Sequence, residues 1–287
     1  MNQDLFPPLV LDGWFVLHQF FRVDPLAAED ETHGGFPGRT EALVDFLSQW
    51  SEPSDSDPER GSRGWSGLYR IVGGETDYML MHFRPTLEEL GDAEREIRRS
   101  PVARDLIPTG DYVSVVELGL YAVTDALLEQ AQEEGIKPGG PEWTARVEKV
   151  LEEELEKRYV QSRLFPLQPA NMPYVCFYPM DKRRNPDQNW YTLPVRKRAD
   201  LMAVHGQTGR RYAGRISQVI SGSVGLDDWE WAVTLFSQDP LTFKALVTEM
   251  RYDEVSSVYA EFGSFWVGHR IPTEAVLEEV AGGVDRG

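Results

Sequence analysis

"DYMLMHFRPTLEELGDAEREI", residues 77–97, and "EWAVTLFSQDPLTFKALVTEM", residues 230–250, follow the same pattern in the two halves of the chain. Each stretch begins as an apolar strand, passes through a turn that contains proline and continues as an amphipathic helix. Thr86 and Asp239 are residue types that commonly cap a helix N-terminus, and Pro240 suits a first helical position. The two stretches therefore indicate one supersecondary unit that occurs twice.

The flanking elements extend each unit to the order strand–helix–strand–strand–helix–strand, which is the ferredoxin-like order. The predicted strands are 13–22, 67–72, 78–83 and 112–118, then 174–182, 216–221, 230–236 and 262–267. The predicted helices are 40–50 and 86–99, then 195–212 and 239–249. We therefore predict an α+β fold with two ferredoxin-like halves, which by fold analogy pack sheet against sheet into a barrel.

Composition suggests how the chain is divided. Loops rich in glycine, proline, serine and acidic residues are predicted at 28–38 and 51–64, and the tail is predicted to be an acidic helix that frays at "GGVDRG". The predicted segments are a first ferredoxin-like half (1–121), an acidic helical linking insertion (122–170), a second ferredoxin-like half (171–272) and the tail (273–287).

Bulk properties exclude several classes of protein. The 287 residues are 41% hydrophobic and 11% aromatic, which permits a well-packed core. The single Cys176 rules out an internal disulfide and a multi-cysteine metal site, and it favours a reducing, cytoplasmic compartment. No signal peptide pattern and no run of ~18 apolar residues is present, so no membrane span is expected. The net charge of −18 disfavours nucleic acid as a partner.

Positive charge is nevertheless concentrated in residues 182–215. Nine lysines and arginines stand there against two aspartates, which gives a local charge of +7 within an acidic chain. A zone of this kind suits a small anionic ligand. The alternative is a solvated basic surface that only balances acidic neighbours.

The strand in "VCFYPMDKRRNPDQNWY", residues 175–191, has two different faces. Pro179 within it predicts an edge strand or a bulge. Side chains two residues apart lie ~6.6 Å from each other, so Tyr178 and Lys182 span ~13 Å, about the width of a porphyrin with its side chains. The alternative is a strand that simply runs out into solvent. One face carries Tyr174, Cys176, Tyr178, Met180 and Lys182, and the other carries Val175, Phe177, Pro179 and Asp181.

None of the five histidines forms a pair with metal-ligand spacing, and the motifs GxSxG, GxGxxG and the P-loop are absent. His18 and His82 lie in apolar strands and are predicted to be core or edge histidines. His205 lies on a predicted helix. It is either another core histidine or the single axial ligand of a cofactor that brings four ligands of its own, as haem does.

Several motifs resemble the coproheme decarboxylases of the chlorite dismutase-like superfamily, in the type typical of Gram-positive bacteria. These motifs are "YPMDKRR", "NWY", "LMAVHGQTGRRYAG", "SQVISGSVGLDDWEWAVTLF" and "EMRYDEVSSVYAEFGSF". The resemblance is dense over 174–268 and looser in the first half, where "LDGWFVLHQFFRVD" is the clearest piece. The acidic loop at 51–60, the length of 122–160 and the tail depart from the family pattern.

The resemblance implies a dimeric α+β barrel, a homopentameric ring and a porphyrin site in the second half. The implied substrate and redox cofactor is iron coproporphyrin III (coproheme), with hydrogen peroxide as oxidant. Two propionates would lose carbon dioxide and become the vinyls of the product, haem b. The resemblance is also compatible with a transient contact with coproporphyrin ferrochelatase.

Position by position, the resemblance assigns His205 as the axial iron ligand, with an unidentified acceptor for its other ring nitrogen. Tyr178 matches the catalytic tyrosine, whose radical takes a hydrogen atom from a propionate. Lys182 matches the lysine beside the reactive propionates, and Gln218 matches the distal glutamine above the iron. The remaining matches, Arg251, Ser256, Arg163 and Met180, are assigned to binding of the propionates and of the porphyrin edge.

Three other functions remain open at this point. A haem carrier would bind porphyrin without needing Tyr178 or Lys182. A haem peroxidase would need a distal acid–base group, and the amide of Gln218 is a poor one. A ferredoxin-like interaction domain would bind no porphyrin. Chlorite decomposition is not expected, because true chlorite dismutases carry a distal arginine where this chain has Gln218.

Overall fold

The computed structural model describes residues 5–27, 35–50 and 63–281, and it contains both predicted ferredoxin-like units. Thr86 caps a helix as predicted, because its hydroxyl accepts a hydrogen bond of 3.2 Å from the Glu89 backbone N–H. The first unit consists of β1 (Val10–Val23), α1 (Gly35–Trp50), β2 (Trp65–Ile71), β3 (Tyr78–Arg84), α3 (Leu87–Arg99), the 3₁₀ turn η4 (Pro101–Arg104) and β4 (Leu106–Gly119).

The second unit repeats this order with additions before its last strand. Pro240 occupies the cap position of α8 and not its first helical position, while the Asp239 carboxylate accepts a hydrogen bond of 3.0 Å from the Leu241 N–H. The unit consists of β5 (Tyr174–Lys182), the hairpin β6 (Arg184–Asn185) and β7 (Gln188–Asn189), the 3₁₀ turn η5 (Trp190–Thr192), α7 (Val195–Arg210), β8 (Ile216–Gly222), β9 (Trp231–Ser237), α8 (Leu241–Met250), α9 (Glu254–Tyr259), β10 (Ala260–Phe262) and β11 (Trp266–Ile271).

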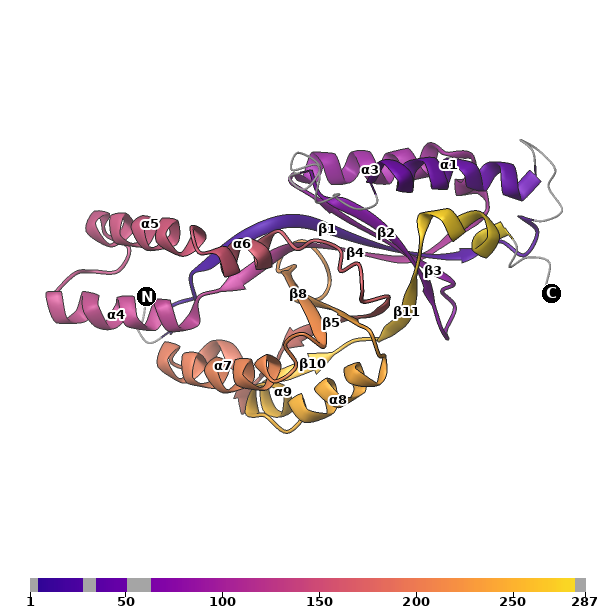
Figure 1. Cartoon of the computed structure of the whole chain (residues 1–287). Helices are drawn as coiled ribbons and strands as arrows, with labels where there is room; N and C mark the ends of the chain where they lie inside the picture. The colour runs from indigo at the N-terminus through magenta and orange to yellow at the C-terminus, as the bar shows by residue number, and fades with distance from the viewer. Residues whose placement is uncertain (1–4, 28–34, 51–62, 282–287) are drawn as a thin grey trace.

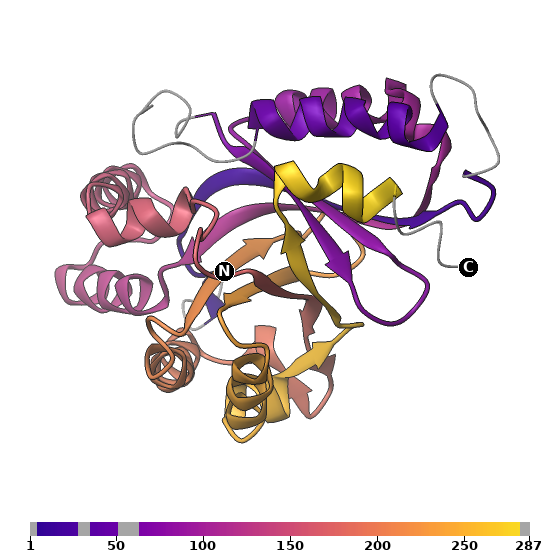
Figure 2. The same cartoon turned by 45° about the vertical axis from the view of Figure 1, so that its right-hand side comes forward.

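The strands of the two units form one closed ring. The first unit has the order β2-β3-β1-β4 and the second has the order β11-β5-β9-β8, so each places its first strand between its third and its fourth. The pairing of β11 with β2 joins the units on one side. On the other side β4 and β8 meet through Val115–Gly222 and Val116–Ser221. The strands curve around a common interior as a result (Figure 2).

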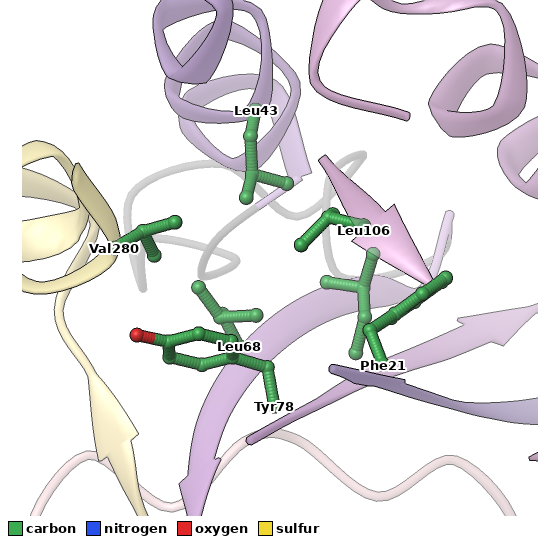
Figure 3. Close-up of a pocket in the computed structure, with 7 residues that line it drawn as sticks. Phe21, Leu43, Leu68, Tyr78, Leu106 and Val280 are labelled. Carbon is green, nitrogen blue, oxygen red and sulfur yellow. The ribbon is translucent and has the colours of Figure 1, made fainter. Parts of the chain in front are cut away.

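Aromatic side chains fill the interior of this ring, among them Trp65, Phe83 and Phe177, each no more than 1% exposed. Helices cover its outer face: α1 and α3 lie over the first unit, and α7, α8 and α9 lie over the second (Figure 1). Over the first unit α1 buries apolar side chains together with the Arg39–Asp105 ion pair of 2.7 Å. Leu43 of α1 and Val280 near the C-terminus converge on Leu68 and Phe21 around a small pocket (Figure 3).

Three helices lie between the two units, in the region predicted to be helical. They are α4 (Tyr121–Glu134), α5 (Pro141–Leu155) and α6 (Arg158–Leu164). α4 packs against α7, while α6 packs against β4 and β1. The predicted division of the chain into four segments remains a prediction. No helix among the residues placed by the structure is long and apolar enough to cross a membrane.

Several boundaries differ from the sequence predictions. The predicted loop 28–38 is wrong over 35–38, where α1 has already begun, and residues 28–34 lie outside the described ranges. The predicted loop 51–64 lies outside them over 51–62. The tail forms a 3₁₀ turn, η6 (Thr273–Ala275), and a π-helical turn, η7 (Leu277–Ala281), instead of one α-helix, and its predicted frayed end "GGVDRG" is not among the described residues.

The predicted strand 262–267 is wrong in its middle, where residues 263–265 separate β10 from β11. Pro179 of β5 lies opposite this break and has no N–H to offer the ladder, while its carbonyl accepts a hydrogen bond of 2.9 Å from Gly263. β5 is not an edge strand, since it pairs with β9 on one side and with β10 and β11 on the other. The irregularity that Pro179 predicted therefore lies in the neighbouring strand.

Candidate functional site

The two faces of β5 are separated as predicted. Val175 and Phe177 belong to the cluster inside the ring. Cys176 and Tyr178 belong to a second cluster on the outer face, which we call the outer cluster, together with residues of β9 and α8 and with Tyr212, which follows α7. Met180 packs against the same outer cluster. The candidate residues of β5 therefore lie under the helical layer of the second unit.

Tyr178 is held in place by aromatic neighbours. Its ring stacks on Phe265 at 4.4 Å between centroids and 24° between planes, and it lies 5.9 Å from the ring of Phe262. The residue is 5% exposed. Burial raises the pKa of its hydroxyl well above the ordinary value, with a further increase from Cys176 and an opposing effect of Arg251. The side chain is therefore a protonated phenol at neutral pH.

Lys182 ends the same face as a buried ammonium, 7% exposed. Its Nζ lies 4.4 Å from the centroid of the Trp190 ring. Burial lowers the pKa of Lys182 to about 8, against the opposing fields of Asp253 and Glu230. Its backbone N–H donates to the Glu230 carboxylate at 2.8 Å.

His205 lies on α7 and is fixed by a carboxylate. Its Nδ1 lies 2.9 Å from Oδ2 of Asp253, while Oδ1 of Asp253 accepts the Ser256 N–H at 2.9 Å and so caps α9. Burial tends to raise the pKa of Asp253, but the hydrogen bonds from His205 and Ser256 outweigh it and lower the pKa. An ionised Asp253 favours the tautomer with a proton on Nδ1, which leaves Nε2 as the ligand atom. Asp253 is the acceptor that the sequence could not identify.

Gln218 lies on the same outer face as Tyr178. Its neighbours at alternate positions of β8, Ile216 and Ile220, pack against the outer cluster, and Val219 points into the ring. Gln218 pairs with Leu235 of β9, which in turn pairs with Cys176 of β5. Its side chain is exposed.

The turn between α8 and α9 brings further candidates together. The Arg251 guanidinium lies 3.6 Å from the centroid of the Phe262 ring, beside Tyr178. Ser256 is buried at the start of α9, one helical turn from Asp253. Arg163 differs from these, because it is an exposed residue of α6, the helix that packs against β4 and β1. Among the described residues, Arg163 forms no hydrogen bond or ion pair with the other candidates.

Much of the predicted cationic zone is paired with acidic residues. Arg196 forms ion pairs with Asp125 and Glu129 of α4 at 2.9 and 2.7 Å. Lys197 pairs with Glu254 at 3.2 Å. The alternative interpretation, a basic surface that balances acidic neighbours, is therefore right for this part of the zone.

His18 and His82 are fully buried, as predicted. His18 Nε2 lies 3.1 Å from the hydroxyl of Thr234, and His82 Nδ1 lies 2.8 Å from the hydroxyl of Ser66. Burial lowers the pKa of His18 to about 3, so this histidine is neutral at physiological pH.

Three residues of the site escaped the sequence reasoning: Asp253, Trp190 and Phe265. Asp253 precedes "EVSSVY" and has the pattern of a helix cap, which was the available signal. Trp190 stood in the quoted "NWY" motif without an assigned role. Phe265 was placed inside a continuous strand, which hid its position in the break opposite β5.

The donor set fits an iron porphyrin with carboxylate side chains. A histidine with Nδ1 engaged and Nε2 available is what an axial ligand requires. Lys182 on the strand face and Arg251 in the helical layer are cations that can bind carboxylates. A buried phenol beside them can lose an electron and a proton. These features are the ones that a porphyrin-binding redox site between a β-sheet and a helical layer requires.

Comparison with known proteins agrees with a site of this class. The family model described as chlorite dismutase matches residues 40–271. This chain belongs to the chlorite dismutase family. A curated protein of Thermus thermophilus, named coproheme decarboxylase, is 41% identical over 277 residues, which cover 94% of this chain and 95% of that protein.

Solved structures give the same result for the fold. The structure of a haem-binding protein from Thermus thermophilus is 39% identical, with a TM-score of 0.74 over 97% of this chain and 98% of that one. A mutant chlorite dismutase from Candidatus Nitrospira defluvii is 17% identical, with a TM-score of 0.68 over 94% of this chain and 97% of that one. The second similarity concerns the fold alone.

Proposed function

We propose that this chain is a hydrogen peroxide-dependent coproheme decarboxylase, which converts two propionates of iron coproporphyrin III to vinyls and so produces haem b. The observation that carries the proposal is the position of Asp253: its Oδ2 engages Nδ1 of His205 and its field acts on Lys182, which shares a strand face with Tyr178. The 41% identity to the Thermus coproheme decarboxylase supports it.

The overall reaction balances. Each propionate, –CH₂CH₂COO⁻, gives a vinyl group, carbon dioxide, one proton and two electrons. One hydrogen peroxide takes up these two electrons, the released proton and one further proton from solvent, and becomes two waters. Ferric coproporphyrin III, when bound, supplies the redox chemistry that connects these two halves.

The residues of this chain then have distinct tasks. His205 offers Nε2 to the iron, and Asp253 fixes the orientation of the ring. Tyr178 gives up an electron and a proton, takes a hydrogen atom from the β-carbon of a propionate and becomes a phenol again. Its raised pKa means that the hydroxyl does not lose its proton to solvent before the reaction. Lys182 holds the carboxylate that leaves as carbon dioxide.

The other candidates bind and orient. The Gln218 amide would donate a hydrogen bond to peroxide. Arg251 and Ser256 bind the propionates that are retained, and Met180 packs on the porphyrin edge. Arg163 is proposed as a further propionate contact, with support from the resemblance alone.

The deciding experiment is titration with ferric coproporphyrin III, stepwise addition of peroxide and mass spectrometry of the porphyrin. Successive loss of two carboxyl groups is expected. Tyr178→Phe should bind coproporphyrin normally and fail to release carbon dioxide, while Tyr159→Phe, an exposed tyrosine of α6, should behave as wild type. A Soret shift followed only by bleaching in the wild type would contradict the proposal.

A second candidate is a haem carrier without turnover, which is favoured by the relative described as a haem-binding protein. Under that function Tyr178→Phe and wild type would be indistinguishable. We also propose, from the family resemblance, a cytoplasmic homopentamer that contacts coproporphyrin ferrochelatase transiently. Light scattering of the purified protein tests the assembly.

A further inference from the structure

The ammonium of Lys182 has an unusual environment for a buried charge. Among the residues that the structure describes, no carboxylate lies within 4.0 Å of Nζ and no acceptor forms a hydrogen bond with it. The group that contacts it is the Trp190 ring, 4.4 Å away. A buried lysine is normally paired with a carboxylate. Here an aromatic face takes the place of that partner.

The acidic residues nearest to Lys182 are occupied elsewhere. Glu230 accepts the Lys182 backbone N–H at 2.8 Å and lies 3.5 Å from the Arg184 guanidinium. Asp253 uses one oxygen for His205 and the other for the cap of α9. Both carboxylates favour the charged form of Lys182 through their field, but neither forms an ion pair with it. The N–H donors of the ammonium stay available to an incoming anion.

Trp190 is itself rigidly held. It is 1% exposed, and its backbone N–H donates to the Arg183 carbonyl at 3.0 Å. Tyr121, at the start of α4, and Tyr259, at the end of α9, pack against its ring at 6.1 and 5.8 Å between centroids. The indole is therefore fixed by α4 on one side and by the second unit on the other.

We propose that Trp190 is a positioning residue for Lys182: its ring holds the ammonium through a cation–π contact and presents the free N–H donors to a substrate carboxylate. The aromatic ring attracts the charge of the ammonium through its π face. An ion pair within the protein would instead tie an N–H donor of Lys182 to a protein carboxylate. The inference rests on the proposed function, because the carboxylate it needs is a propionate of the porphyrin. It also gives a role to Tyr121, the first residue of α4, since its ring supports the indole.

The test uses Trp190→Leu, Trp190→Phe and the matched control Trp143→Leu, which removes another buried tryptophan from α5, in a separate apolar cluster. Affinity for ferric coproporphyrin III is measured by Soret titration, and KM and kcat are measured with peroxide. Trp190→Leu should bind about 10-fold more weakly and raise KM, whereas Trp190→Phe, which keeps an aromatic face, should lose about 3-fold or less. Trp143→Leu should bind as wild type does.

A double-mutant cycle separates positioning from general damage to the pocket. In the Lys182→Met background, Trp190→Leu should cause no further loss of affinity, because the ammonium that it positions is gone. An equal loss in both backgrounds, or equal affinities of Trp190→Leu and Trp143→Leu, would overturn the inference. If Trp190→Leu does not fold, the same cycle with Trp190→Met, which also removes the aromatic face, decides. If the wild type does not convert coproporphyrin, the proposed function is wrong. The binding cycle can still be interpreted in that case, because it measures affinity and not turnover.

Discussion

Replacing Lys182 by methionine is expected to stabilise the fold at neutral pH, although it removes a residue of the proposed site. Burial lowers the pKa of this lysine from 10.5 to about 8. Since one unit corresponds to about 1.36 kcal/mol, the buried charge costs about 3 kcal/mol in free energy of unfolding. Methionine fills a similar volume at a repacking cost of up to about 1.5 kcal/mol, so the expected net gain is about 1–2 kcal/mol.

The sign of the pH dependence follows from the direction of the shift. Below pH 8 the lysine is charged in both the folded and the unfolded state, and the full cost is present. Between 8 and 10.5 the folded protein loses this proton while the unfolded chain keeps it, so the wild type gains stability with rising pH relative to the variant. The advantage of Lys182→Met should therefore appear as the pH falls through this window and be nearly absent above it.

Urea denaturation of both proteins at about pH 7 and about pH 10 measures the effect. Lys244→Met is the control, because Lys244 is exposed on α8 and its replacement removes the same charge. It should change stability by less than about 0.5 kcal/mol at either pH. A variant Lys182→Met that is less stable than wild type at neutral pH, or whose gain is the same at both pH values, would refute the reasoning.

Two further substitutions test the surroundings of the site. Asp253→Asn should keep α9, because asparagine caps a helix as well as aspartate does. It should lower porphyrin affinity or activity about 10- to 100-fold, because it weakens the acceptor of His205. Circular dichroism measures the helix and Soret titration measures the affinity, and normal activity would contradict the role of the carboxylate. Gly222→Ala would drive a Cβ into Oε2 of Glu117, a residue whose carboxylate accepts a hydrogen bond of 2.7 Å from the Trp231 indole. Displacing that carboxylate should cost about 1–3 kcal/mol of stability. Thermal unfolding and tryptophan fluorescence measure this loss of stability, and the variant Glu117→Gln should lose less. An unchanged melting temperature in Gly222→Ala would contradict the close approach of Gly222 to the Glu117 carboxylate.

The features that could be predicted from sequence are those set by local periodicity. The alternation along β5 was enough to place Tyr178 and Lys182 on one face and Phe177 on the other, because successive side chains of a strand point to opposite faces whatever the partner strands are. The ferredoxin-like order followed from the repeated strand, turn and helix. The closed ring followed from fold analogy and was confirmed by the pairings of β11 with β2 and of β4 with β8.

What could not be predicted depends on partners that are distant in the chain. The sequence gives no sign that the carboxylate of Asp253 reaches His205, 48 residues earlier, because that contact arises only when α7 packs beside the α8–α9 turn. The break between β10 and β11 is caused by Pro179, which lies on another strand. In both cases the local structure depends on a residue that is distant in the sequence.

The two halves have the same topology, yet the candidate site occurs in one of them, and packing on the outer face explains why. In the first half, α1 lays Leu43, Phe46 and Leu47 on the sheet. The C-terminal segment adds Val276 and Val280, and this apolar layer takes up the space over the strands (Figure 3). In the second half the equivalent helix, α7, carries the half-buried His205 among polar residues. The candidate residues therefore lie in the unit whose outer face carries His205 beside an apolar cluster, whereas α1 and the C-terminal segment cover the outer face of the first unit.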